Sequence, residues 1–214
     1  MAIVLSFSGS HGVGKTSLVN KISSQYSTNF INNEDYKIFK EINTGLFNIG
    51  FSLNGNGFDF DEVIFSQKQA FDLGYNLINY YLNKKNDERL IITDRSCIDT
   101  YLYTKYFVSK MKDISLYKEL LLDMHNKSIE VMCKIINILV PPFCDFEILT
   151  DRMSIEQRDE IWESFTQYFS EYKKSSLVYT TKGQSTDKRS IEVLDMLSNH
   201  IKQYQPHYKV SLVS

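Results

Sequence analysis

A glycine-rich segment near the amino terminus constrains this chain more than any other part of its sequence. Residues 9–16 read GSHGVGKT and match the pattern G-x-x-x-x-G-K-[ST] at every fixed position. The apolar run at residues 3–7 is typical of a buried strand, and residues 17–22 have the apolar spacing of a helix. A strand, a glycine loop and a helix in this order form a cradle whose backbone N–H groups point at one anion.

This cradle predicts a binding site for a nucleoside triphosphate such as ATP. Lys15 is placed to reach the β and γ phosphates, and the Thr16 hydroxyl is placed to hold Mg²⁺. The alternative is a glycine-rich turn that matches the pattern by accident, but such a turn needs neither the strand nor the helix beside it. The predicted nucleotide-binding residues are Gly9, Ser10, His11, Gly12, Val13, Gly14, Lys15, Thr16 and Ser17.

Length, charge and cysteine content narrow the class of protein. A chain of 214 residues can form one α/β domain, but it is too short for two ordinary domains with a linker. The formal net charge of -2 gives no electrostatic footprint for duplex DNA, so nucleic acid is not a favoured partner, although a local basic patch stays open. No apolar run approaches the roughly twenty residues that span a bilayer. The 3 cysteines lack metal-ligand or redox spacing, so we expect a cytoplasmic protein with reduced thiols.

Apolar strand-like runs alternate with helical patterns, which predicts one three-layer α/β/α domain over residues 1–214, with a parallel sheet covered on both faces. The expected strands cover residues 3–7, 36–42, 89–93, 135–140 and 177–181. The expected helices cover residues 15–26, 61–83, 99–108, 114–132, 154–174 and 186–204. In the last helix, the residues expected to face inward are Ile191, Leu194, Leu197 and Ile201.

Sheets of this kind bind ligands outside the carboxyl ends of their strands, where this sequence places polar residues. Asp94 follows the third strand, where its carboxylate would face the cradle and hold Mg²⁺ directly or through water, unless it only caps the next turn. Arg95 would hold an acceptor phosphate or carboxylate, or else be a solvated surface charge. Glu41 ends the second strand and is the first candidate to orient an acceptor hydroxyl and take its proton, a plain surface charge being its alternative.

Two arginines flank a helix start in the least regular part of the second half. Phosphoryl transfer spreads negative charge over the equatorial oxygens, so Arg152 and Arg158 on a mobile segment could close over them. Surface arginines on an amphipathic helix are the alternative. Ser154 and Gln157 have the spacing of a capping box that opens this helix.

Three segments resemble the thymidylate kinase-like branch of P-loop proteins: the sequence FSGSHGVGKT, the sequence DRSCID at residues 94–99, and Asp151-Arg152 followed by Arg158. The nearest group is the small AAA-type ATPases and kinases that are common in bacteriophages and related to nicotinamide riboside kinases. The resemblance implies a five-stranded sheet of order 2-3-1-4-5 and an arginine-bearing lid at about residues 143–160. It also implies an adenine pocket near residues 182–188. In that family, the Asp-Arg pair lies by the acceptor and the metal, and a Glu ending the second strand is the base of nucleoside kinases.

The sequence thus predicts a kinase that transfers the γ-phosphoryl group of ATP to a nucleoside or nucleoside monophosphate, in the host cytoplasm if it is phage-encoded. Two alternatives stay open: a kinase that phosphorylates a hydroxymethylpyrimidine in DNA, and an ATPase or nucleotide-dependent switch without a small acceptor. The predicted metal ligands are Thr16 and Asp94, and either Asp94 or Glu41 is the base. A homodimer also stays open. The predicted catalytic residues are Lys15, Glu41, Asp94, Arg95, Arg152 and Arg158.

Overall fold

The computed structural model of the chain describes residues 2–29, 36–39, 60–84, 90–142 and 154–204. The strands are β1 (Ile3–Ser8), β2 (Tyr36–Phe39), β3 (Leu90–Asp94), β4 (Ile136–Leu139) and β5 (Leu177–Thr180). The helices are α1 (Lys15–Asn29), α3 (Phe60–Asn83), α4 (Cys97–Ser109), the 3₁₀ helix η1 (Ile114–Tyr117), α5 (Lys118–Met132), α6 (Ile155–Glu171) and α7 (Thr186–Tyr204).

The strands form one sheet of order β2-β3-β1-β4-β5, held together by four parallel pairings. This is the order that the resemblance implies. The first strand lies at the centre, where Leu5 is paired with Ile92 of β3 and with Ile136 of β4. Every residue of β1 is buried, as expected for a central parallel strand covered on both faces. The glycine-rich segment that follows β1 therefore lies at the middle of the carboxyl edge of the sheet.

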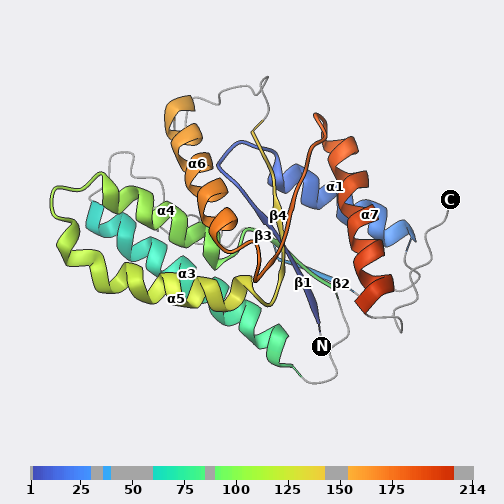
Figure 1. Cartoon of the computed structure of the whole chain (residues 1–214), viewed down its shortest axis with the longest axis horizontal. Helices are drawn as coiled ribbons and strands as arrows, with labels where there is room; N and C mark the ends of the chain where they lie inside the picture. The colour runs from blue at the N-terminus through green and yellow to red at the C-terminus, as the bar shows by residue number, and fades with distance from the viewer. Residues whose placement is uncertain (1, 30–35, 40–59, 85–89, 143–153, 205–214) are drawn as a thin grey trace.

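Helices cover both faces of the sheet, which gives the predicted three layers (Figure 1). One face is covered by α1 and α7, and its core includes Leu5 and Phe7 of β1. The other face is covered by α3, α4, α5 and α6, and it receives Val4 of β1. The alternation along β1 follows from the period of two along a strand, which sends successive side chains to opposite faces.

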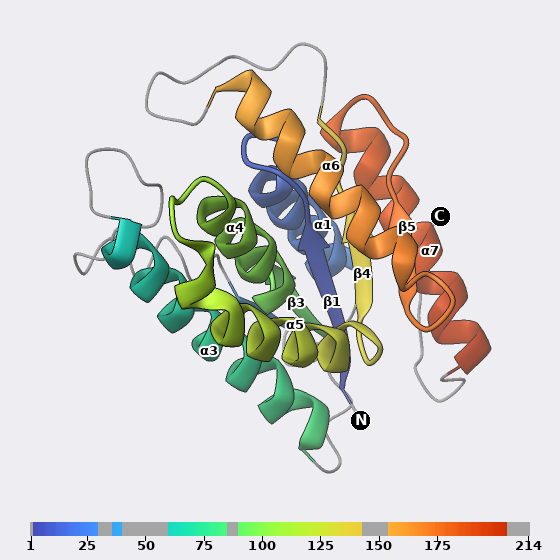
Figure 2. The same cartoon turned by 60° about the vertical axis from the view of Figure 1, so that its left-hand side comes forward.

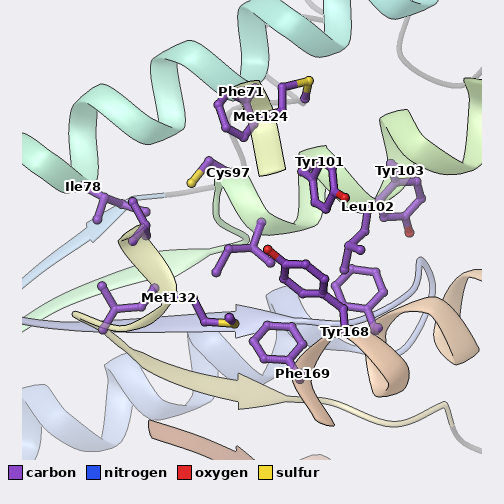
Figure 3. Close-up of a cluster of buried hydrophobic side chains, with 14 of the residues drawn as sticks. Phe71, Ile78, Cys97, Tyr101, Leu102, Tyr103, Met124, Met132, Tyr168 and Phe169 are labelled. Atoms are coloured by element: carbon purple, nitrogen blue, oxygen red, sulfur yellow. The ribbon is translucent and has the colours of Figure 1, made fainter. Parts of the chain in front are cut away.

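The larger core is built around α4, in which eleven of thirteen residues are buried. This helix packs against α3, α5 and α6 (Figure 2). Its side chains meet aromatic and sulfur-containing residues of those helices (Figure 3). Because α4 is enclosed, its first turn, which follows β3, is held firmly against the sheet. The residues labelled in Figure 3 are Phe71, Ile78, Cys97, Tyr101, Leu102, Tyr103, Met124, Met132, Tyr168 and Phe169.

Two details of the helices bear on the sequence predictions. The capping box is confirmed: the Ser154 hydroxyl accepts from the Gln157 N–H, and the Gln157 side chain accepts from the Ser154 N–H. The inward face of α7 agrees with the prediction at Leu197, which is buried, and at Leu194, which packs against the core, but Ile191 is 55% exposed. Arg189 and Val193 are buried instead. The rotation of α7 about its axis is thus set by more than its apolar residues. Among the described helices, none has the length and apolar character that crossing a bilayer requires.

Candidate nucleotide-binding site

The phosphate loop (residues 9–16) connects β1 to α1 and has the backbone of an anion cradle. Gly9, Gly12 and Gly14 have φ values of 152°, 71° and 84°, in the region that side chains rarely adopt. At Gly9 there is also no room for a side chain, because a Cβ would lie 2.7 Å from the Val140 carbonyl oxygen. The glycines of the motif are therefore required by the backbone and by the neighbouring strand.

Lys15 begins α1, and its ammonium group lies inside the phosphate loop. Its side chain is 4% exposed, and Nζ donates to the carbonyl oxygens of Gly9 at 2.9 Å and Ser10 at 2.6 Å. A buried ammonium beside a ring of glycine N–H groups forms a positive concavity at a helix N-terminus. Such a concavity binds phosphate.

Thr16 and Asp94, which are 78 residues apart in sequence, are brought together at the edge of the sheet. The Thr16 hydroxyl donates to Oδ2 of Asp94 at 2.5 Å, and the Asp94 side chain is 3% exposed. Asp94 ends β3, the strand beside β1, so the parallel pairing carries it to the start of α1. A hydroxyl and a carboxylate oxygen side by side fit the preference of Mg²⁺ for oxygen ligands. Their role as metal ligands stays a prediction.

Arg95 directly follows Asp94 at the end of β3. Its φ of 81° places a non-glycine residue in the left-handed region, and its N–H donates to the Phe7 carbonyl oxygen at 3.1 Å. Its guanidinium lies over the Tyr103 ring of α4, 5.3 Å from the centroid. A left-handed conformation at a non-glycine residue costs about 1–2 kcal/mol, and such conformations cluster at functional sites.

Comparisons with solved structures agree with this geometry. One structure of NadR protein in complex with NAD and AMP-PNP matches with a TM-score of 0.66 and 16% identity, over 100% of this chain and 52% of that one. Another, in complex with NR, matches with a TM-score of 0.67 and 15% identity, over 100% and 54%. A thymidylate kinase from Ehrlichia chaffeensis matches with a TM-score of 0.57 and 16% identity, over 92% and 98%.

The chain has a P-loop kinase fold. It spans about half the length of the NadR chains that it matches. No protein-family model matches the sequence, and no curated protein sequence matches it.

Asp99 is a residue of this P-loop kinase fold to which sequence reasoning assigned no role. It lies in the first turn of α4, is 1% exposed, and accepts from the Ser8 hydroxyl at 2.7 Å and from the Gly9 N–H at 3.3 Å. Burial raises the pKa of the Asp99 carboxyl, and the positive charges of Lys15 and Arg95 act in the opposite direction.

A local signal for Asp99 is present, because Ser96 and Asp99 have the spacing of a capping box and form one. That signal predicts a helix start. It does not predict the contact with the phosphate loop.

A second such residue is Arg189 of α7, which is 3% exposed and donates from Nη1 to the Val13 carbonyl oxygen at 3.3 Å. It follows the segment in which the resemblance implies an adenine pocket, residues 182–188. That segment connects β5 to α7 and begins beside β4, where the Thr181 N–H donates to the Leu139 carbonyl oxygen at 3.0 Å. Sequence reasoning offered no signal for an arginine that contacts the phosphate loop.

The remaining predicted site residues are not all placed. Glu41, Arg152 and most of the expected lid (residues 143–153 of 143–160) lie outside the described residues. Arg158 is in the first turn of α6, where its guanidinium pairs with the neighbouring Asp159 at 3.0 Å. In the phosphate loop, Ser10 and Val13 are buried, His11 is partly buried and Ser17 is exposed.

Proposed function

We propose that the protein is an ATP-dependent kinase that transfers the γ-phosphoryl group to a nucleoside or a nucleoside monophosphate. The observation that carries this proposal is the pairing of Thr16 with Asp94 beside a phosphate loop that encloses the Lys15 ammonium. Phosphoryl transfer depends on positioning and electrostatic stabilisation more than on covalent chemistry, and these groups supply both.

Each group on the donor side has a distinct role. The N–H groups of the phosphate loop hold the β and γ phosphates, and Lys15 neutralises negative charge that grows on the transferred group. Thr16 and Asp94 would hold Mg²⁺, which neutralises the phosphate oxygens when bound. Asp94 also orients the Thr16 hydroxyl, since the two are hydrogen-bonded.

The proposed acceptor site is beside Arg95. A planar guanidinium binds a phosphate or carboxylate in two parallel hydrogen bonds, and the Tyr103 ring holds that guanidinium in place. Glu41 is the proposed base, with Asp94 as its alternative, and Arg152 and Arg158 are the proposed arginines of a lid.

The acceptor class is supported by the structural neighbours, which bind or act on nucleotides by name: NadR with NAD, NR and AMP-PNP, and a thymidylate kinase. An ATPase without a small acceptor would have no use for a strained, half-buried arginine beside the proposed metal ligand.

The test is to incubate the purified protein with γ-labelled ATP and Mg²⁺, adding one acceptor at a time: nucleosides, NR, monophosphates and hydroxymethylated DNA. We expect label on one small acceptor. Lys15→Met should abolish transfer, and Thr16→Ser, which keeps the hydroxyl, should retain more activity than Thr16→Ala. If only DNA is labelled, the acceptor is a modified base in DNA and not a small molecule. Phosphate release without any acceptor would favour the ATPase or switch.

A further inference from the structure

A buried arginine lies on the side of the phosphate loop away from Asp94. Arg189 donates from Nε to the Gly183 carbonyl oxygen at 2.8 Å, and from Nη2 to the Pro141 carbonyl oxygen at 2.8 Å. Its third contact is the Val13 carbonyl oxygen at 3.3 Å. The three acceptors belong to the phosphate loop, the segment after β4, and the β5–α7 loop (residues 181–185). One guanidinium therefore joins three segments at the carboxyl edge of the sheet.

Two glycines of these segments, Gly183 and Gly9, lie close against neighbouring chain. A Cβ on Gly183 would lie 2.8 Å from Cβ of Lys188 and 2.9 Å from the Arg189 nitrogen. On the other side, a Cβ on Gly9 would meet the Val140 carbonyl oxygen. Gly183 is thus packed against the first turn of α7, which carries Arg189, and Gly9 is packed against the segment after β4.

The charge of Arg189 is placed against local preference. It lies near the N-terminus of α7, where the helix dipole disfavours a cation. Burial lowers the pKa of Arg189 to about 10, against the opposite effect of Glu192, so the guanidinium stays protonated at neutral pH. Residues that break a local rule in a folded protein are found at functional sites more often than elsewhere.

The contact with Val13 acts on the phosphate through one peptide group. The Val13 carbonyl and the Gly14 N–H belong to the same peptide, and in loops of this kind that N–H faces the phosphate. A cation that donates to the carbonyl oxygen polarises the peptide, which strengthens its N–H as a donor.

We propose that Arg189 is a positioning residue for the triphosphate. It fixes the phosphate loop, the end of β4 and the β5–α7 loop in one arrangement, and it strengthens the Gly14 N–H through the Val13 carbonyl. The proposal rests on the proposed use of ATP.

The test measures affinity for Mg²⁺-ATP and Mg²⁺-tripolyphosphate by calorimetry on the wild-type protein, Arg189→Met and Arg189→Lys. We expect Arg189→Met to weaken both ligands by about tenfold or more, which corresponds to about 1.4 kcal/mol. Arg189→Lys keeps the charge but cannot reach three carbonyls, so its affinities should lie between those of the wild type and those of Arg189→Met. The matched control is Lys174→Met, which removes an exposed positive charge after α6 and should leave both affinities unchanged.

A purely structural role gives a different result. In that case, Arg189→Met would lower the melting temperature, while its folded fraction would bind both ligands within about twofold of the wild type, and the proposal would be wrong. If Arg189→Met does not fold, the same criterion applies to Arg189→Lys. Methylguanidinium added to Arg189→Ala should restore part of the lost affinity, and no restoration would count against the proposal. A wild-type protein that binds neither ligand would overturn the proposed function itself.

Discussion

Two buried ionisable residues, one acidic and one basic, contact the phosphate loop from its two sides, and they differ in what they bind. Asp99, on the β3 side, accepts from a hydroxyl and from backbone N–H groups. Arg189, on the β4 side, donates only to carbonyl oxygens in its three backbone contacts. The loop is thus held through the Gly9 N–H on one side and through the Val13 carbonyl on the other. A cradle fixed in this way needs little reorganisation when an anion arrives.

The surroundings of the two charges also differ. Asp99 lies close enough to Lys15 and Arg95 that both lower its pKa, so three charges of the site depend on one another. Arg189 donates to three carbonyl oxygens, and Glu192 raises its pKa. Buried N–H groups without a partner are rarer in proteins than buried carbonyls that keep a second lone pair unused. We therefore expect the β3 side to tolerate substitution less well than the β4 side.

The largest effect is expected for Asp99→Ala. This substitution leaves the Ser8 hydroxyl and the Gly9 N–H buried without their acceptor and removes a charge that faces two cations. A loss of about 3 kcal/mol in the free energy of unfolding follows from such deletions, and urea denaturation followed by circular dichroism measures it. The control, Asp123→Ala, removes an exposed partner of Lys127 and should change stability by less than about 1 kcal/mol. A smaller loss of stability for Asp99→Ala than for Arg189→Met would show that the β3 side tolerates substitution better than the β4 side.

The next effect concerns the glycines at the two junctions. Gly9→Ala places a Cβ against a backbone carbonyl at a positive φ, whereas Gly183→Ala meets Cβ of Lys188 at 2.8 Å and the Arg189 nitrogen at 2.9 Å without a positive φ. Overpacking of this kind costs about 1–3 kcal/mol, and we expect Gly9→Ala to lie at the upper end and Gly183→Ala below it. Thermal unfolding of both variants measures the difference. Equal melting temperatures would show that both junctions are equally rigid.

The contributions of Asp99 and Arg189 to stability should also differ in their dependence on pH. Because burial raises the pKa of Asp99, its folded carboxyl holds a proton more tightly than the unfolded one. Its contribution to stability is therefore fully present below about pH 3.9 and is lost as the pH rises through the folded pKa. We expect the stability of the wild type relative to Asp99→Asn to fall between pH 4 and pH 7, measured by urea denaturation. The stability of Arg189→Lys should change with pH as that of the wild type does. If the stability of Asp99→Asn also runs parallel to that of the wild type, Asp99 is not the source of the pH dependence.

The smallest effect on stability is expected away from both sides of the loop. Arg158 pairs with its neighbour Asp159, and its side chain is 18% exposed, so Arg158→Ala should change the free energy of unfolding by less than about 1 kcal/mol. A fall in kcat for this variant then reports on phosphoryl transfer and not on folding. Asp159→Ala is the matched control, because it breaks the same pair and keeps the arginine. Equal kcat values for both variants and the wild type would remove Arg158 from the proposed lid.

The fold was largely predictable because its signals are local. The buried strands are continuous apolar runs, and the phosphate loop and the capping box at Ser154 are short motifs with a fixed geometry. The position of Asp94 at a strand end was also readable, and parallel pairing then carries it to Thr16. The strand order came from the family resemblance, since apolar runs do not show which strands are neighbours.

The amino-acid sequence by itself determined the elements, the phosphate loop and the residues at the carboxyl ends of the strands, because backbone preference and apolar spacing act over a few residues. Only the tertiary structure decided that Asp99 and Arg189 hold that loop, since their contacts with it join residues 90 and 176 positions apart. It also decided the rotation of α7, in which a buried guanidinium with three acceptors accompanies an exposed Ile191. Long-range hydrogen bonds to backbone carbonyls leave no pattern in the sequence, because every residue carries the same acceptor.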